Sequence, residues 1–135
     1  MELDRAMRIA AAGMDVQTSR LRVVAENLAN RDTTSEVAGG DPFRRKNVTF
    51  ANRFDRALGA NTIRVARVGT TKGEFPTRHD PTHPAANAQG YVKTPNVNST
   101  IETMDMREAQ RSYSANLSVL EVSRGMLTRT IEAMR

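Results

Sequence analysis

The two histidines of the chain, His79 and His83, stand four residues apart in the segment RHDPTHPAAN, and Asp80 follows the first. An H-x-x-x-H pair binds zinc when a helix places both rings on one face. Pro81 and Pro84 exclude a helix here, because proline lacks the backbone donor and clashes with the preceding turn. No third ligand follows at a suitable spacing. We therefore expect an ordered loop of turn-forming residues rather than a metal site.

The other residue types that carry chemistry show no useful arrangement. Serine, aspartate and histidine are too scattered to suggest a catalytic triad, and the segment GGDP lacks the lysine and the preceding strand of a phosphate-binding loop. The absence of cysteine excludes disulfides and thiolate metal or redox sites. The sequence thus predicts a chain that is not an enzyme and that uses neither a metal nor a cofactor.

A basic run, Arg44-Arg45-Lys46, is the one candidate for an electrostatic site. With Phe43 and Phe50 on either side, it could hold phosphates. The run could equally form the solvated face of a strand, or attach the chain to an acidic partner protein. The residue types leave these three alternatives open.

Apolar periodicity at both ends predicts the long elements that must position such sites. A helix is expected over about residues 3–29, and a second one, starting with a capping box at Ser99 and Glu102, to the C-terminus. The first seam consists of Leu3, Met7, Ala10, Met14, Gln17, Leu21, Val24 and Leu28. The second seam consists of Met106, Gln110, Tyr113, Leu117, Leu120, Arg124, Leu127, Ile131 and Met134.

Both seams step by four and three residues, which is a heptad pattern. This pattern suits an ordinary two-helix core in a monomer, or a polymer subunit whose burial comes from neighbouring copies. The seam residues cover little apolar area and the middle of the chain is polar, which favours the polymer. Gly13 and Gly125 favour it too, because a glycine inside a helix costs about 1 kcal/mol relative to alanine. Without partners for its seams, the isolated subunit should be partly helical with mobile ends.

The expected fold is mainly α, with the N- and C-terminal helices (residues 1–30 and 99–135) pairing as a coiled-coil-like unit. Residues 31–98 form a short irregular middle with a few β-strands. The segments FRRKNVTF and TIRVARV predict strands, and a third is expected around Tyr91-Val92. Phe50, Phe54 and Leu58, at i, i+4 and i+8, predict two helical turns.

The net charge of +5 is confined to the middle of the chain. Residues 1–30 hold four acids and four bases, residues 99–135 hold five of each, and residues 31–98 hold eleven bases and six acids. A DNA-binding helix carries its positive surplus on the helix itself, and here both predicted helices are neutral. A basic helical nucleic-acid-binding protein is therefore the weaker alternative, and a regulatory helical adaptor is a third hypothesis.

Four ordered motifs carry a resemblance to a known family. They are NLAN (residues 27–30), GGDPFRRKNVTF, DPTHPAANAQGYVKTPNVN and MDMREAQRSYSANLSVLE. With these motifs the chain resembles the flagellar basal-body rod family, and within it the proximal rod proteins, over most of its length. It departs from the family at Ser99 and Thr100, where apolar residues are usual, and at Arg124, where lysine is common.

The resemblance implies a structural subunit that assembles with copies of itself and with rod proteins of the FlgB, FlgF and FliE types. Their product is a hollow shaft across the periplasm, which transmits torque and forms the export channel. The subunit would leave the cytoplasm through the flagellar type III export apparatus, consistent with an N-terminal segment that predicts neither a cleaved signal nor a membrane span. No nucleic acid and no membrane insertion are implied.

The resemblance also implies roles for particular residues. The segment FANRF, with Phe50 and Phe54, matches an export-gate motif, although one packed helical turn has the same spacing. Contacts between subunits are expected from the basic run and from loop residues His83, Pro84, Asn87, Gly90, Tyr91, Pro95 and Asn96. Helix packing and assembly are expected from Asn27, Asn30 and Asn116 together with the apolar seam residues.

The asparagines around Leu28 pose a question of their own, since asparagine is unfavourable inside a helix. Asn30 is expected to be a C-cap in the left-handed conformation that asparagine tolerates. A cap does not explain Asn27. We hypothesise that Asn27 and Asn116 donate hydrogen bonds to backbone between packed helices and so fix their register.

Overall fold

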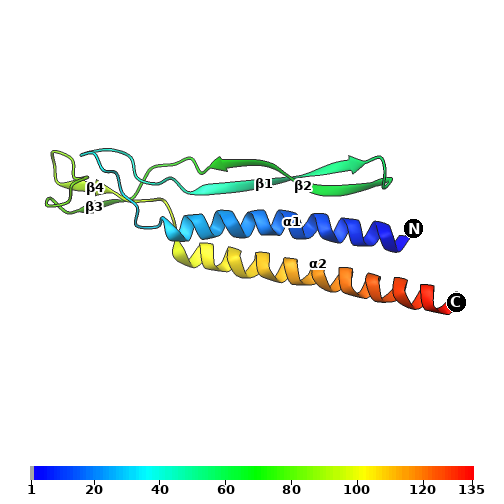
Figure 1. Ribbon diagram of the computed structural model, residues 1–135. Coiled ribbons are helices and arrows are strands. Elements are labelled where there is room, and N and C mark those ends of the chain that lie inside the picture. Colours follow the sequence, from blue (N-terminus) through cyan, green and yellow to red (C-terminus); the bar gives the residue numbers. More distant parts are fainter. Residues whose placement is uncertain (1) are drawn as a thin grey trace. The chain divides into compact units, whose positions relative to one another are not determined.

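The computed structural model describes residues 2–135 and has a long helix at each end of the chain, with short strands between them (Figure 1). The elements are α1 (Glu2–Ala29), β1 (Lys46–Asp55), β2 (Ala60–Thr70), β3 (Thr77–His79), β4 (Tyr91–Lys93) and α2 (Ser99–Ala133). The mainly helical class with a strand-containing middle is thus confirmed. Neither helix is long and apolar enough to cross a membrane, as far as the described residues go.

Contacts within the chain group its residues into two compact units. Unit 1 comprises residues 2–21, 48–67 and 106–135, and unit 2 comprises residues 22–47 and 68–105. Each helix contributes one segment to each unit, and the β1–β2 sheet lies mostly in unit 1.

In unit 1 the two helices run antiparallel and approach each other closely. Arg20 pairs with Glu108 at 3.4 Å. Gly13, which lies nearer the N-terminus of α1, contacts Asn116, which lies nearer the C-terminus of α2. A Cβ atom on Gly13 would stand 2.8 Å from the amide of Asn116, a separation that real Cβ contacts do not show. The glycine therefore leaves room for the Asn116 side chain of the second helix. Ala10 and Ala109 are also buried in unit 1, so small side chains contribute to its core.

The buried row of α2 is offset from the predicted seam. Ala109 and Ser123 are buried and Asn116 is half-buried, and these three residues repeat every seven positions. Gln110 and Arg124, the polar interruptions of the predicted seam, are exposed. Alternate seam positions therefore lie one residue earlier than predicted, because small residues that allow close approach decide the contact rather than the largest apolar ones.

The segment from Phe50 to Leu58 is not helical, and the prediction of two helical turns is wrong. Residues up to Asp55 form β1, which pairs with β2 in a two-stranded sheet. The carboxylate of Asp55 accepts the amides of Ala57 (2.9 Å) and Leu58 (3.2 Å), and Gly59 adopts a positive φ of 63°. This turn chemistry overrides the i, i+4 spacing. The strands predicted at FRRKNVTF and TIRVARV are confirmed as parts of β1 and β2, although β1 begins only at Lys46.

In unit 2, β3 and β4 form a second, antiparallel sheet in which Arg78 pairs with Val92 and His79 with Tyr91. Val92 is fully buried, and Ala85 is 2% exposed in the loop between the strands. The strand around Tyr91-Val92 is confirmed. β3 escaped prediction because its three residues are polar and too few to show an alternation.

Both caps at the helix ends differ from their predictions. No described residue other than glycine has a positive φ, so Asn30 does not cap α1 in the left-handed conformation. Its side-chain amide instead donates to the carbonyl of Glu26 at 2.8 Å. At the start of α2 the N-cap is Asn98, whose Oδ1 accepts the amides of Thr100 (3.0 Å) and Ile101 (3.4 Å). Ser99 is thus the first helical residue and no capping box forms.

Candidate functional site: a buried polar junction

Unit 2 contains a cluster of polar side chains where α1 ends, β1 begins and α2 begins. We call it the polar junction and define it by Asn27, Arg45, Lys46, Asn96 and Glu102. Asn27 and Glu102 are both 0% exposed. Buried polar groups persist in a fold only when they are hydrogen-bonded, and each of these has its partners inside the unit.

Asn27 joins α1 to the start of β1 through two reciprocal hydrogen bonds. Its Nδ2 donates to the carbonyl of Lys46 at 2.9 Å, and its Oδ1 accepts the amide of Lys46 at 2.8 Å. The side chain thus bonds the strand backbone as a neighbouring strand would. An asparagine inside the last turns of a helix is explained by this pairing.

Glu102 brings the first turn of α2 to the same point. Its Oε1 accepts a hydrogen bond from Nε of Arg45, and its Oε2 accepts one from Nδ2 of Asn27 at 3.3 Å. Arg45 also pairs with Asp105 at 3.5 Å. The buried carboxylate is therefore held by a guanidinium and an amide, the arrangement that offsets the cost of removing a charge from water.

The strand side of the junction is completed by Asn96 and Thr71. Asn96 accepts the backbone amide of Arg45 at 2.8 Å, and Thr71 donates its own amide to the carbonyl of Arg45 at 2.8 Å. The Thr71 hydroxyl accepts from Nη1 of Arg45 at 3.2 Å. Both backbone groups and the side chain of Arg45 are thus fixed.

The polar junction can position the backbone, but it offers no free group for catalysis or metal binding among its defining residues. The two carboxylates belong to a network whose cations are already paired, and Lys46 forms a further ion pair with Glu26 at 2.8 Å. Within residues 2–135 no three histidine, cysteine or acidic side chains gather as a metal site would require. The junction sets the point at which the chain leaves α1, enters β1 and later starts α2.

The basic run predicted as an electrostatic site is engaged within the unit. Arg44 stacks on Phe75, with its guanidinium carbon 4.2 Å from the ring centre, and donates to the carbonyls of Thr71 and Gly73. Arg45 and Lys46 belong to the junction. All three cations therefore have intramolecular partners, which the sequence alternatives did not include. Contacts of this run with other subunits stay a prediction.

The predicted loop residues also hold their own loop together. His83 Nδ1 accepts the amide of Ala85 at 3.0 Å, and Asn87 Oδ1 accepts the amides of Gln89 and Tyr91 at 3.0 Å each. Gly90 has a φ of +84°, a conformation that favours glycine. Of the remaining loop residues, Pro95 is buried in unit 2 and Pro84 is exposed. Their contacts with other subunits stay a prediction.

The helix-packing residues divide into those with neighbours in the chain and those without. The half-buried group consists of Leu3, Met7, Met14, Leu21, Leu28, Asn30, Met106, Tyr113, Asn116, Leu117 and Leu120, and Val24 is buried. Leu127 and Ile131 are 37% and 51% exposed. Asn116 donates to the carbonyl of Ser112 in its own helix at 3.0 Å, and Asn27 donates to the carbonyl of Lys46 on β1. Neither side chain therefore bonds the backbone of the opposite helix, contrary to our hypothesis. Phe50 is half-buried and Phe54 exposed, both on β1.

Sequence reasoning missed the role of Glu102, which was placed in a capping box, and of Asp105. The signal was present: two acids three residues apart lie on one face of a helix, and a basic run stands elsewhere in the chain. Pairing the two features would have indicated the junction. The part played by Thr71 had no comparable signal, because a lone threonine in a loop shows no pattern.

Comparison with known proteins gives the class of this chain. Residues 88–133 match the family described as flagellar basal body rod FlgEFG protein C-terminal. The matched stretch contains β4, the Asn98 cap and all of α2. The chain therefore has the C-terminal region of a flagellar basal-body rod protein.

Relatives that match nearly the whole chain narrow this class. The flagellar basal-body rod protein FlgC of Agrobacterium fabrum is 45% identical over 133 residues, which is 98% of this chain and 96% of the relative. FlgC of Salmonella typhimurium is 38% identical over 91% of each chain, and FlgC of Bacillus subtilis is 33% identical over 93% of this chain and 94% of its own. The chain belongs to the FlgC family of flagellar basal-body rod proteins.

Membership of this family makes the chain a structural subunit of the rod, located in the basal body of the bacterial flagellum. It confirms the resemblance to the flagellar basal-body rod family that the four motifs carry. Assembly with other rod components follows from membership, and the family is not a class of enzymes. The nucleic-acid-binding alternative has no support among these relatives.

Proposed function

We propose that this rod subunit builds the proximal rod by packing its helices against those of neighbouring subunits. In this proposal α1 and α2 pair as a coiled-coil-like unit that belongs to the inner tube of a hollow shaft. The shaft transmits torque and forms the export channel. The observation that supports it is the surface of α2 in unit 1, which leaves apolar side chains without cover.

The uncovered side chains lie in the C-terminal segment of α2, which we define as residues 119–133. Val122 is 57% exposed and Met126 50%, and Val119 precedes them on the same helix face at a spacing of three and four residues. Leu127 and Ile131 are also exposed. A helix segment with two exposed apolar rows is typical of a surface that another protein covers.

Gly125 lies in a shallow groove formed with Glu121, Val122, Met126 and Arg129. A Cβ atom at Gly125 would meet nothing within 4 Å. No contact inside the described chain therefore requires a glycine here, although glycine weakens the helix. The approach of a helix from another subunit would supply the reason, as Asn116 does at Gly13 in the same unit.

We propose the remaining features from family membership. Neighbouring subunits are further copies of this chain and rod proteins of the FlgB, FlgF and FliE types. The flagellar type III apparatus exports the subunit, with Phe50 and Phe54 as its gate motif, and export needs no cleaved signal. The subunit acts without catalysis, without nucleic acid and without inserting into a membrane.

The experiment replaces Val122 and Met126 with glutamate in a motile strain of the source bacterium. Export of the subunit should stay normal, whereas intact rods counted by electron microscopy of basal bodies should fall by about tenfold or more, because unpaired charges buried between helices cost several kcal/mol.

The matched control replaces Gln110 and Ser114 with glutamate. These exposed residues have the same i, i+4 spacing on α2. At 3.6 residues per turn they are rotated by about 120° around the helix from Val122 and Met126, so rods and motility should remain near normal. Equal loss of rods in both variants, or equal loss of export and assembly in the first, would contradict the proposal.

A further inference from the structure

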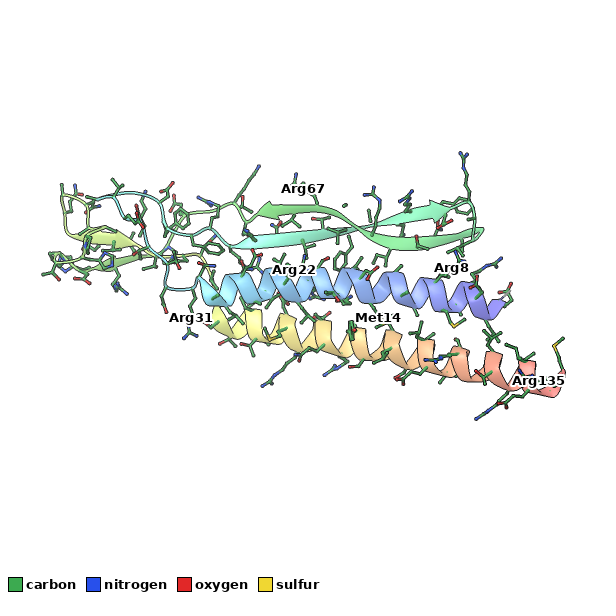
Figure 2. The ribbon with its side chains drawn as sticks, in the orientation of Figure 1. Arg8, Met14, Arg22, Arg31, Arg67 and Arg135 are labelled. Atoms are coloured by element: carbon green, nitrogen blue, oxygen red, sulfur yellow. The ribbon has the colours of Figure 1, made fainter. Side chains whose placement is uncertain are left out.

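The β1–β2 hairpin carries an unusual concentration of arginine. Arg53 lies on β1, Arg56 in the turn, and Arg64 and Arg67 on β2 (Arg67 is labelled in Figure 2). All four are exposed. Residues 48–67 contain four bases and one acid, so three of the five surplus positive charges of the chain lie on this hairpin.

None of these four guanidinium groups forms an ion pair anywhere in the part of the chain that the structure describes. Asp55, the one acid in residues 48–67, uses a carboxylate oxygen to accept two amides of its own turn. The hairpin therefore presents its positive charge to the surroundings.

The cations of unit 2 behave differently. Lys46 pairs with Glu26 at 2.8 Å and Lys93 with Asp41 at 3.1 Å, while Arg45 is held by Glu102. The basic run that looked like an attachment point is thus occupied within the chain. The free positive charge lies on the strands that follow it.

We propose that the β1–β2 hairpin is a docking surface for an extended acidic segment of another protein, which pairs with a free edge of this sheet. The sheet has only two strands, so each leaves one edge with unpaired backbone donors and acceptors. An added strand would satisfy that edge while its carboxylates meet the arginines. The planar guanidinium holds a carboxylate through two parallel hydrogen bonds, which a lysine does not do.

A polypeptide fits this surface better than a nucleic acid does. Only a polypeptide strand brings the alternating N–H and C=O groups that the sheet edge lacks. Four arginines also offer few phosphate contacts, and residues 1–30 and 99–135 each sum to zero charge. The exposed ring of Phe54, 61% accessible on β1, gives the partner an apolar contact beside the charges.

Exposed charges on an edge strand have a second known use, which is to prevent edge-to-edge association of identical sheets. The two roles predict opposite results when the charge is removed. A docking surface loses its ligand and stays monomeric, whereas a protected edge begins to self-associate. The inference goes beyond rod assembly through α2, because it concerns a different surface and a different chemistry.

The test uses the full chain and a fluorescent peptide of alternating glutamate and valine, as long as β2, followed by anisotropy. We expect saturable binding that weakens by about tenfold or more when Arg53 and Arg64 are both changed to glutamate. Changing them to glutamine should give a smaller loss. The same peptide with N-methylated backbone amides should bind more weakly than the parent, because it cannot pair with the edge.

The control changes Arg107 and Arg111, which are exposed on α2, to glutamate. The change of charge is the same, and the affinity for the peptide should stay within about twofold. Circular dichroism of each variant checks that the fold is kept, and the glutamine variant serves if the glutamate variant unfolds. Absence of saturable binding, equal losses in both arginine pairs, or tighter binding to duplex DNA or to anionic vesicles would overturn the proposal. Self-association of the glutamine variant without loss of peptide binding would do so as well.

Discussion

The polar junction of unit 2 and the C-terminal segment of α2 in unit 1 differ in which side chains they remove from water. At the junction the chain buries groups that dislike burial, Asn27 and Glu102, and gives each its hydrogen-bond partners. In the C-terminal segment it exposes Val122, Met126 and Ile131, which would gain by burial.

This difference separates a region whose contacts are complete within one molecule from a region that, in our proposal, other subunits cover. Directional polar contacts fix the path of the chain inside one molecule, so that each copy has the same geometry where its strands leave the helix. Apolar surface without direction suits the lateral contacts of a polymer, whose strength is summed over many subunits.

The largest effect is expected at Arg45. Changing Arg45 to methionine leaves the carboxylate of Glu102 buried without its cation, which should lower the free energy of unfolding by about 3–5 kcal/mol. Denaturant unfolding of the isolated subunit, followed by circular dichroism, measures it. Adding Glu102→Gln to this variant should restore part of the loss.

Arg78 supplies the control for this change. It lies 4.0 Å from Asp80 with 56% of its side chain exposed, so Arg78→Met should cost no more than about 1 kcal/mol. An Arg45 variant as stable as the Arg78 variant would show that the junction does not hold the fold together.

A smaller effect is expected at Asn27, and here the choice of substitution sharpens the comparison. Asn27→Asp keeps the acceptor for the Lys46 amide but loses both donated bonds and adds a charge beside Glu102. It should destabilise the subunit by about 2–3 kcal/mol, which the same denaturant titration detects. Asn61→Asp, at an exposed position of β2, should be nearly neutral, and equal effects would refute the role assigned to Asn27.

The smallest effects are expected at the two helical glycines, with opposite signs. Gly13→Ala inserts a methyl group against Asn116, and we expect a net loss of about 1 kcal/mol after the gain in helix propensity. Gly125→Ala meets open space in the isolated subunit and should stabilise it by about 0.5–1 kcal/mol. Thermal melts of both variants give the signs.

The Gly125 variant also tests assembly. If another helix covers Gly125 in the rod, the stabilised subunit should assemble less well than the wild type. A variant that is more stable and assembles normally would mean that the groove at Gly125 stays uncovered.

The sequence was sufficient for the elements whose signal is long and periodic. The two helices were predicted to within a few residues because their apolar repeat extends over many turns, and β2 was predicted because Ile63 and Val65 alternate with polar neighbours. It was not sufficient for the part of β1 that follows Phe50, where the spacing of Phe50 and Phe54 fits a helix and only the turn at Asp55 decides for a strand.

The junction shows why a site of this kind is hard to find in one sequence. Asn27 is recognisable as a polar residue in an apolar helix. Its partner is a backbone group of Lys46, and backbone partners cannot be identified from residue types. Glu102 had a sufficient local explanation as a helix-start residue, which hid its long-range partner Arg45. The offset of the α2 seam has a similar cause, since Ala109 and Ser123 carry too little apolar weight to set a predicted heptad.

Hydrogen exchange on the isolated subunit, read residue by residue, tests most directly whether the chain completes its junction alone and leaves α2 for its neighbours. The account predicts strong protection of the Lys46 amide, which Asn27 accepts, and fast exchange over residues 124–133 that slows on assembly into rods. Equal, strong protection of both regions in the lone subunit would contradict it.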